Sequence, residues 1–201
     1  WRYDSLGNRV AEVSANGFAA AQSNADWARA ARTGLGLPAD ASQLSAAQRQ
    51  QALDAHTTRT WFDAAGRAVL MVDQNGHAKS AQYDAVGNLV RSTVHATALD
   101  IAQVAALDAL HAPAVAAAND DRRGDRISDR VFDKADRVIL ERSAAAREYV
   151  NGQWIDSHRA EMRSVYDAVG NLVRSIDGNG NVSYQYFDDA NRLAGRIDAA
   201  G

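Results

Sequence analysis

The ten residues YDAVGNLVRS occur twice in this chain without a single change, at positions 83–92 and 166–175. The shortest steps between copies of this aromatic-Asp phrase, from residue 62 to 83 and from 166 to 187, are both 21 residues long. A phrase that returns at a fixed step indicates a chain assembled from one repeated structural unit. Four looser copies begin at Tyr3, Phe62, Phe132 and Phe187.

An Asp followed three places later by Gly punctuates these units. Asp at the first position of a type I turn bonds its own downstream backbone, and Gly at the fourth position tolerates a positive φ. In two copies Asp136 and Asn191 replace the Gly, and these residue types best tolerate the left-handed conformation. Successive turns stand 10 or 11 residues apart, which leaves about six or seven residues for each strand. The Asp/Gly pairs are Asp63/Gly66, Asp73/Gly76, Asp84/Gly87, Asp167/Gly170, Asp177/Gly180 and Asp198/Gly201.

The segments between the turns alternate as strands do. Val182, Tyr184 and Tyr186 fall on one side of such a strand, and Ser183 and Gln185 fall on the other. Neither side is purely polar, so we expect packing on both faces, with the repeat aromatics as a structural spine. The sequence therefore predicts a mainly β fold: an antiparallel meander of β-hairpins, curled or spiral, with short α-helical insertions.

Three insertions interrupt the meander. The first, at about 14–58, predicts helices over 24–33 and over 46–55, the second opened by a capping box of Ser45 and Gln48. The second insertion, at about 94–126, predicts a helix over 98–111 with Thr97 as its cap. The third, at about 143–161, contains Asn151-Gly152 inside Tyr149–Ile155 and predicts a hairpin that extends the sheet.

The copies are of two kinds, and the difference falls at one turn position. The three Tyr copies carry Gly-Asn there, whereas the three Phe copies carry Arg67, Arg137 and Arg192. We expect these arginines to pair with aspartates of neighbouring repeats or to stack on aromatic rings, and we interpret them as structural rather than ligand-binding.

Composition excludes several classes of function. The 201 residues carry 22 Lys and Arg against 25 Asp and Glu, a net charge of −3, which disfavours nucleic-acid binding driven by bulk charge. The absence of cysteine excludes disulfides, thiolate zinc ligands and a cysteine nucleophile. The longest uncharged runs are alanine-rich and broken by polar residues, so no membrane span is predicted.

Residues of catalytic or metal-binding type are present, but not at the spacing that such chemistry requires. No H-E-x-x-H or G-x-S-x-G motif occurs. Residues 177–181 begin like a calcium loop, but Val182 stands where that loop needs Gly, and we interpret the segment as a hairpin turn. The sequence thus predicts no catalytic, cofactor-binding or metal-ligating residue. The five histidines, His56, His77, His95, His111 and His158, lie in five unrelated settings.

Three tryptophans offer an alternative. Trp27, Trp61 and Trp154 are suited to stacking on sugar rings, which would make the chain a binding module. Trp61 adjoins the aromatic Phe62 and Trp154 lies in the predicted hairpin, so packing inside the protein is the favoured interpretation.

The repeated phrase, its step of 21 residues and its D-x-x-G turns resemble the YD repeats of the RHS family, which occurs in bacterial polymorphic toxins, toxin-complex shells and teneurins. The resemblance covers nearly all of residues 1–201 outside the insertions, which we take as one YD-repeat segment of a larger bacterial protein. It implies a long β-sheet that spirals into a shell, and a secreted or cell-surface location. Self-cleaving members of the family carry a D-P motif, which is absent here, so self-cleavage is not expected.

These observations favour a non-enzymatic scaffold segment of a secreted or surface toxin or adhesin, a β-wall that encapsulates, displays or extends other domains. Its expected partners are neighbouring repeats of the parent chain and, by the resemblance, a toxin-domain cargo or a cell-surface glycan or protein. The alternative is a glycan- or host-surface-binding module that uses exposed aromatics and insertions. A hydrolase with an unrecognised site is the least favoured hypothesis.

Overall fold

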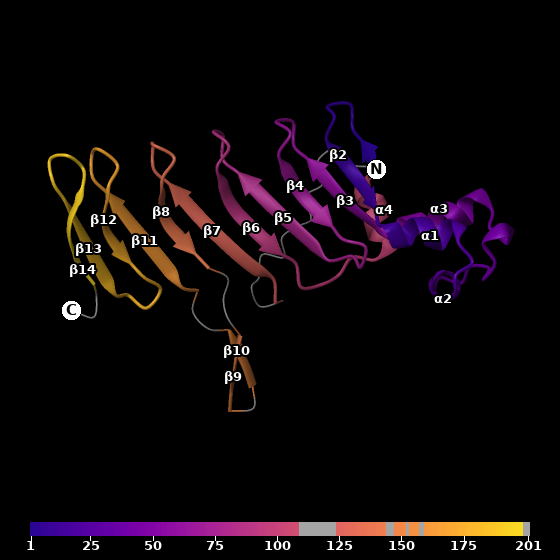
Figure 1. Cartoon of the computed structure of the whole chain (residues 1–201). Coiled ribbons are helices and arrows are strands. Elements are labelled where there is room, and N and C mark those ends of the chain that lie inside the picture. Colours follow the sequence, from indigo (N-terminus) through magenta and orange to yellow (C-terminus); the bar gives the residue numbers. More distant parts are fainter. Residues whose placement is uncertain (109–123, 144–146, 152, 157–158, 199–201) are drawn as a thin grey trace. The chain divides into compact units, whose positions relative to one another are not determined.

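The computed structural model describes residues 1–108, 124–143, 147–151, 153–156 and 159–198 (Figure 1). Its helices are α1 (Ala15–Gln22), α2 (Asp26–Gly34), the 3-10 helix η1 (Ala41–Gln43), α3 (Ala46–Asp54) and α4 (Ile101–Asp108). Its strands are β1 (Arg2–Tyr3), β2 (Arg9–Val13), β3 (Thr57–Phe62), β4 (Ala68–Val72), β5 (Ala78–Tyr83), β6 (Leu89–Val94), β7 (Arg126–Phe132), β8 (Val138–Arg142), β9 (Arg147–Val150), β10 (Gln153–Asp156), β11 (Glu161–Tyr166), β12 (Leu172–Ile176), β13 (Val182–Phe187) and β14 (Leu193–Ile197).

Twelve of these strands form one sheet, in the order β1 to β8 followed by β11 to β14. Each strand neighbours the next one in that sequence, and the pairings are antiparallel, as in β3 with β4 and β12 with β13. The prediction of a mainly β antiparallel meander with short helices is therefore confirmed, and the sheet is open. The chain divides into two compact units, Trp1–Ser80 with Val94–Ala117, and Ala81–Thr93 with Ala118–Gly201, which are described separately.

In the first unit, one face of β3, β4 and β5 is covered by a helix. Trp61, Leu70, Val72 and Ala78 are buried there against Val104 of α4. Trp61 pairs directly with Leu70, which places both on that face. The interpretation of Trp61 as a packing residue is confirmed, since its side chain is 8% exposed.

The first insertion folds as a small helical layer with its own core. Ala21, Leu37, Ala41, Leu44 and Ala52 are buried together, drawn from α1, η1, α3 and the segments between them. Helix α3 begins after Ser45 and has the predicted capping box with Gln48. Helix α2 begins two residues later and ends one residue later than the predicted 24–33.

One helix was not predicted, and another differs from its predicted bounds. Helix α1 was not predicted; the structure needs Gly17 in it, since a Cβ at that place would lie 2.7 Å from His56 Cβ and from Val13 Cγ1. Helix α4 begins at Ile101, not at 98, and Asp100 rather than Thr97 caps it by exchanging hydrogen bonds with Gln103. The predicted end of this helix at His111 lies outside the described residues.

Arg32 is the polar centre of the helical insertion. Its side chain is 0% exposed, and it donates hydrogen bonds to the carbonyl oxygens of Ala20 at 2.6 Å and Ser23 at 2.7 Å. Further bonds go to the carbonyl oxygens of Pro38 and Ala39 and to Asn24 Oδ1. Ala20 and Ser23 lie at the carbonyl end of α1, where the helix dipole favours a positive charge. The guanidinium therefore closes the end of α1 against the loop that follows α2.

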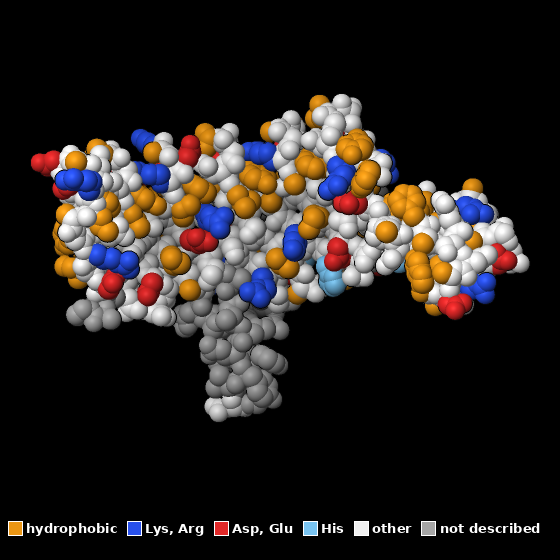
Figure 2. Space-filling model, in the orientation of Figure 1, with side chains coloured by type: hydrophobic (Ala, Val, Ile, Leu, Met, Phe, Trp, Pro, Cys, Tyr) orange, Lys and Arg blue, Asp and Glu red, His pale blue; other side chains and the backbone are white. Residues whose placement is uncertain are grey.

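The second unit is built differently, as one layer of strands. None of the residues of β8 or of 159–198, which include β11 to β14, is fully buried. Over β11 to β14, hydrophobic side chains lie at the surface (Figure 2). The expectation of two packed faces is therefore wrong for these strands, and the repeat aromatics Tyr166 and Phe187 are half-buried.

The third insertion contains the predicted hairpin. Strands β9 and β10 pair antiparallel around Asn151, whose φ is 49°. They form a separate two-stranded sheet, so the expectation that this hairpin extends the main sheet is wrong. The reason is that β8 pairs directly with β11, with Arg142 opposite Glu161, which leaves no place between them for another strand.

Replacing Arg32 is expected to unfold the helical insertion first. Arg32→Ala removes the guanidinium donor from four carbonyl groups that are buried or partly buried, while Asn24 Oδ1 keeps the Ala41 N–H, so we expect a loss of roughly 3 kcal/mol. Arg29→Ala, an exposed change on the same helix, is the control and should stay within about 0.5 kcal/mol. Native-state hydrogen exchange of α1 to α3 measures both, and equal protection in the two variants would contradict the role given to Arg32.

Candidate functional site

The repeated feature of this molecule is its turn, and the described residues contain eight turns of one construction. Each joins two antiparallel strands, begins with Asp and has a positive φ at the fourth residue. Gly occupies that fourth place six times, and Asp136 and Asn191 occupy it with φ values of 57° and 58°. The turn predictions are confirmed where the structure describes them; Asp198/Gly201 lies partly outside. The eight aspartates are Asp4, Asp63, Asp73, Asp84, Asp133, Asp167, Asp177 and Asp188.

The turn at Asp63 shows how one carboxylate organises five residues. The Asp63 N–H donates to the carbonyl of Arg67 at 2.9 Å, and the Gly66 N–H donates to the carbonyl of Asp63 at 3.0 Å. Asp63 Oδ1 accepts the N–H groups of Ala65 and Arg67, both at 2.9 Å. A register shift next to the turn, between Trp61 and Phe62, marks a β-bulge. This is a type I turn followed by a bulge, a common hairpin connection.

The fifth residue of each turn holds the second carboxylate oxygen. Asn171 Nδ2 donates to Asp167 Oδ2 at 2.9 Å, and Arg192 Nε donates to Asp188 Oδ2 at 2.8 Å. Arg67 and Arg137 make the same bond with the Asp of their own turn. The expectation that these arginines pair with aspartates of neighbouring repeats is therefore wrong. Each arginine stands four positions after the Asp of its own turn, and the turn brings the guanidinium and the carboxylate together.

In the second unit, successive turns also contact one another. The turns that begin at Asp84, Asp133, Asp167 and Asp188 lie on one edge, because alternate connections of a meander fall on the same edge. Asn88 Nδ2 donates to Asp136 Oδ1 at 2.8 Å. The Arg137 guanidinium lies 4.6 Å from the centre of the Tyr166 ring, which confirms the expected stacking on an aromatic residue. Side chains of one turn thus contact the next turn along this edge.

Hydrogen bonding lowers the pKa of all eight turn aspartates. For Asp63, Asp133 and Asp188 the first cause is the bond from the turn arginine, and for Asp4 and Asp177 it is the bond from the turn asparagine. For Asp73, Asp84 and Asp167 desolvation raises the pKa, but the hydrogen bonds outweigh it and the net direction is down. The folded chain therefore binds these protons more weakly than ordinary carboxyl groups do.

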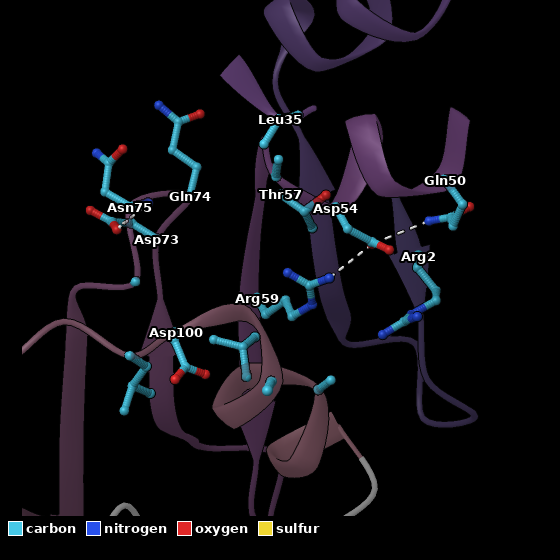
Figure 3. Close-up of a pocket in the computed structure, with 16 residues that line it drawn as sticks. Arg2, Leu35, Gln50, Asp54, Thr57, Arg59, Asp73, Gln74, Asn75 and Asp100 are labelled. Atoms are coloured by element: carbon cyan, nitrogen blue, oxygen red, sulfur yellow. Dashed lines mark hydrogen bonds and ion pairs between the residues drawn. The ribbon is translucent and has the colours of Figure 1, made fainter. Parts of the chain in front are cut away.

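The first unit also contains a cleft of about 1020 Å³ (Figure 3). Its wall is polar: Asp54 and Arg59 form an ion pair at 2.8 Å, and Arg2, Asp73 and Asp100 line the same space. Leu99, Val104 and Ala105 supply an apolar part. Gln74 and Asn75 reach the cleft from the turn between β4 and β5, which places two exposed amide side chains at its edge.

The residues singled out by the sequence do not converge on this cleft. His77 Nδ1 lies 3.1 Å from Asp73 Oδ2 of its own turn, and buried His95 is bonded through Nε2 to Ser80 Oγ at 3.0 Å. His111 and His158 lie outside the described residues. Among the described residues, no group of three His, Asp or Glu side chains is placed to hold a metal ion.

The other two sequence hypotheses also have definite outcomes. Asp177 is used by its turn, since both of its oxygens accept bonds from Asn179 and Asn181. Trp27 lies on α2 with 47% of its surface exposed, so it is not a core residue. The Trp154 side chain lies outside the described part of the chain. None of the described helices is long and apolar enough to cross a membrane.

The lowered pKa values predict how stability depends on pH. A carboxyl group whose pKa is lower in the folded state stabilises that state above its unfolded value of 3.8, and this contribution disappears as pH falls through the folded pKa. We expect a constant urea midpoint from pH 7 to about 5 and a falling midpoint below about 4. Asp188→Asn should make the fall less steep, because one titrating group is gone. A midpoint that rises below pH 4 would contradict this account of the turns.

One comparison with known proteins, with protein-family models, agrees with the repeat. Residues 166–201 match the family model described as RHS repeat. A search of curated proteins gave no match. The similar solved structures include "Crystal Structure of TcdB2-TccC3-TEV" (18% identity), "Crystal Structure of TcdB2-TccC3-Cdc42" (20%) and "Structure of Photorhabdus luminescens Tc holotoxin pore, Mutation TccC3-D651A" (17%), each with a TM-score of 0.30.

Each of these three matches covers 72% of this chain but 8% of the other one, so the chain spans less than a tenth of their length. The family match falls where the phrase copies at Tyr166 and Phe187 stand one 21-residue step apart. It confirms the resemblance drawn from the sequence: the chain carries the RHS repeat, at residues 166–201.

Proposed function

We propose that residues 1–201 form one structural segment of a larger RHS-repeat protein, a β-wall without enzymatic activity of its own. The observation that carries this proposal is the turn, which recurs eight times with the same hydrogen bonds. A catalytic site uses one particular arrangement of residues, whereas a wall uses the same arrangement again and again. A sheet that grows by adding one hairpin after another needs the same turn geometry at each addition, and this chain has that geometry at eight places.

The proposed mechanism is steric. Each unit adds a hairpin whose turn is complete in itself, because one Asp satisfies the backbone of its own five residues. Bonds such as Asn88 to Asp136 then align one hairpin with the next. A parent chain would use such a wall to encapsulate, display or extend other domains. Following the family resemblance, we place it in a secreted or surface-exposed bacterial toxin or adhesin, with neighbouring repeats and a toxin-domain cargo as partners.

A wall of repeats should accept one more repeat. We expect that duplicating residues 166–186 directly after Tyr186 gives a folded chain with higher β content and a melting temperature equal to or above that of the parent, since each unit brings its own turns and contacts only its neighbours. Circular dichroism and thermal denaturation measure this.

The matched control inserts the same 21 residues in scrambled order at the same place. It keeps length and composition but removes the Asp and Gly spacing, and it should lower the melting temperature. If the true duplication unfolds or aggregates while the scrambled insertion does not, the proposal of a propagating wall is wrong.

The cleft of the first unit favours a second candidate, glycan binding. Its charged side chains are of both signs, three aspartates and two arginines, so neither a strongly acidic nor a strongly basic ligand suits it. Hydroxyl groups both donate and accept hydrogen bonds, and therefore fit such a mixed wall. Its volume is at the upper end of the range usual for small-ligand sites. This candidate uses Asn75 and Arg59 rather than the tryptophans that the sequence suggested.

A pair of equivalent turns tests the glycan candidate. Asn75 and Asn179 occupy the same turn position, but only Asn75 lines the cleft. We expect the chain to bind at least one sugar on a glycan array, Asn75→Ala to weaken that binding about tenfold, and Asn179→Ala to leave it unchanged. Equal effects of the two variants, or no binding to any glycan, would exclude the cleft as a sugar site.

A further inference from the structure

The two faces of the second unit carry different side chains. Directly paired residues of adjacent strands share a face, so the register sorts β7 to β14 into two sets. The opposite face holds the pair Arg130 and Glu141, the row Ser164, Ser175 and Ser183, and the pair Gln185 and Arg196. The other set, here named the arginine face, consists of Asp129, Val131, Leu140, Arg142, Glu161, Arg163, Val165, Arg174, Ile176, Val182, Tyr184, Tyr186 and Ile197.

The arginine face carries more positive than negative charge, although the whole chain is negative. Asp129 is shared by Arg91 at 2.6 Å and Arg159 at 3.0 Å. Glu161 is likewise shared by Arg142 at 2.6 Å and Arg163 at 3.0 Å. On the arginine face itself, the three arginines Arg142, Arg163 and Arg174 stand against the two carboxylates of Asp129 and Glu161. Such an imbalance on one face attracts an acidic partner.

On the arginine face, Arg174 has a hydrogen-bond donor without an acceptor. Its Nε atom is buried, and no acceptor among the described residues lies within hydrogen-bond reach of it. The nearest aromatic neighbour is Tyr184, with the guanidinium carbon 6.0 Å from the ring centre. A buried donor without an acceptor carries a desolvation cost that a bound acceptor would remove.

The duplicated decapeptide identifies the missing acceptor. Arg91 and Arg174 are the ninth residues of the two identical copies. Arg91 Nε donates to Asp129 Oδ1 at 2.6 Å, on the strand that follows in the sheet. The strand that follows Arg174 presents Tyr184 instead. The same arginine in the same local sequence therefore has a carboxylate partner in one copy, and no carboxylate among the described residues in the other.

The surroundings of Arg174 are apolar and open to solvent. Val165 is 45% exposed, Tyr184 40% and Ile197 52%, all in the row that contains Arg174. Exposed apolar patches mixed with unpaired charge are typical of interaction sites rather than of free surface. A ligand for this row must offer both a carboxylate and apolar groups.

We propose that the arginine face of β11 to β14 binds an acidic segment of polypeptide that also carries apolar side chains. A Glu or Asp of that segment accepts the bond from Arg174 Nε, as Asp129 accepts it from Arg91, and its apolar side chains cover Val165, Tyr184 and Ile197. Nucleic acids and sulfated glycans bring negative charge without aliphatic side chains, so they fit this face less well. The proposal adds a partner to the wall and does not depend on the wall being tolerant of extra repeats.

The test uses the whole chain and a labelled peptide in which pairs of Glu alternate with pairs of Val, so that each side of it carries both kinds of group. Fluorescence anisotropy should show binding that weakens with salt. Arg174→Gln and Arg163→Gln should each weaken binding, the former about tenfold or more. Arg130→Gln, on the opposite face, is the matched control and should bind as the parent does.

Tyr184→Asp gives a second, opposite test. It supplies Arg174 with an internal carboxylate, as Asp129 does for Arg91, so this variant should fold with equal or greater stability and yet lose the peptide. Binding of the corresponding Lys peptide with equal strength, binding unchanged in Arg174→Gln and Tyr184→Asp, or no binding at all would overturn the proposal. So would a heparin oligosaccharide that binds the face while the Glu peptide does not.

Discussion

One carboxylate in each turn determines where this chain reverses and how its strands pair. The turn Asp accepts two backbone N–H groups with one oxygen and a side chain with the other, and the residue three places later adopts a positive φ. In five of the hairpins, such as the one between β3 and β4, a bulge stands beside the turn, and the turn and bulge together set the register of both strands. A shift of one residue would exchange the two faces of every hairpin, so the side-chain pattern of both units depends on this small group of bonds.

The turn fixes the strands but does not supply a core, and the two units differ for that reason. In the first unit, α4 covers Leu70 and Val72, and the helical insertion buries its own cluster around Arg32. In the second, β8, β11, β12, β13 and β14 contain no fully buried residue. Backbone bonding and cross-strand pairs such as Arg142 with Glu161 hold this layer, and solvent reaches both faces.

The predictable parts of the structure are those written within a few consecutive residues. The turn at Asp63 and the capping box of Ser45 with Gln48 each lie inside five positions, and the sequence predicts both. Helix α1 was not predicted, and the close approach of His56 that requires Gly17 there comes from a residue distant in sequence. The buried role of Arg32 was also not visible, since its acceptors lie in two separate segments, the end of α1 and the loop that follows α2. A pattern read along the chain contains no information on these contacts.

The two copies of YDAVGNLVRS also show that local sequence does not determine contacts with other strands. Ten identical residues give the same turn twice, with Asp84 and Asp167 making equivalent bonds. Yet their arginines have different surroundings, because Arg91 meets Asp129 and Arg174 meets Tyr184. Repetition thus preserves the backbone while the neighbouring strand sets the chemistry of the face. In a protein of this kind, function is to be sought where equivalent residues of the repeat have unequal partners.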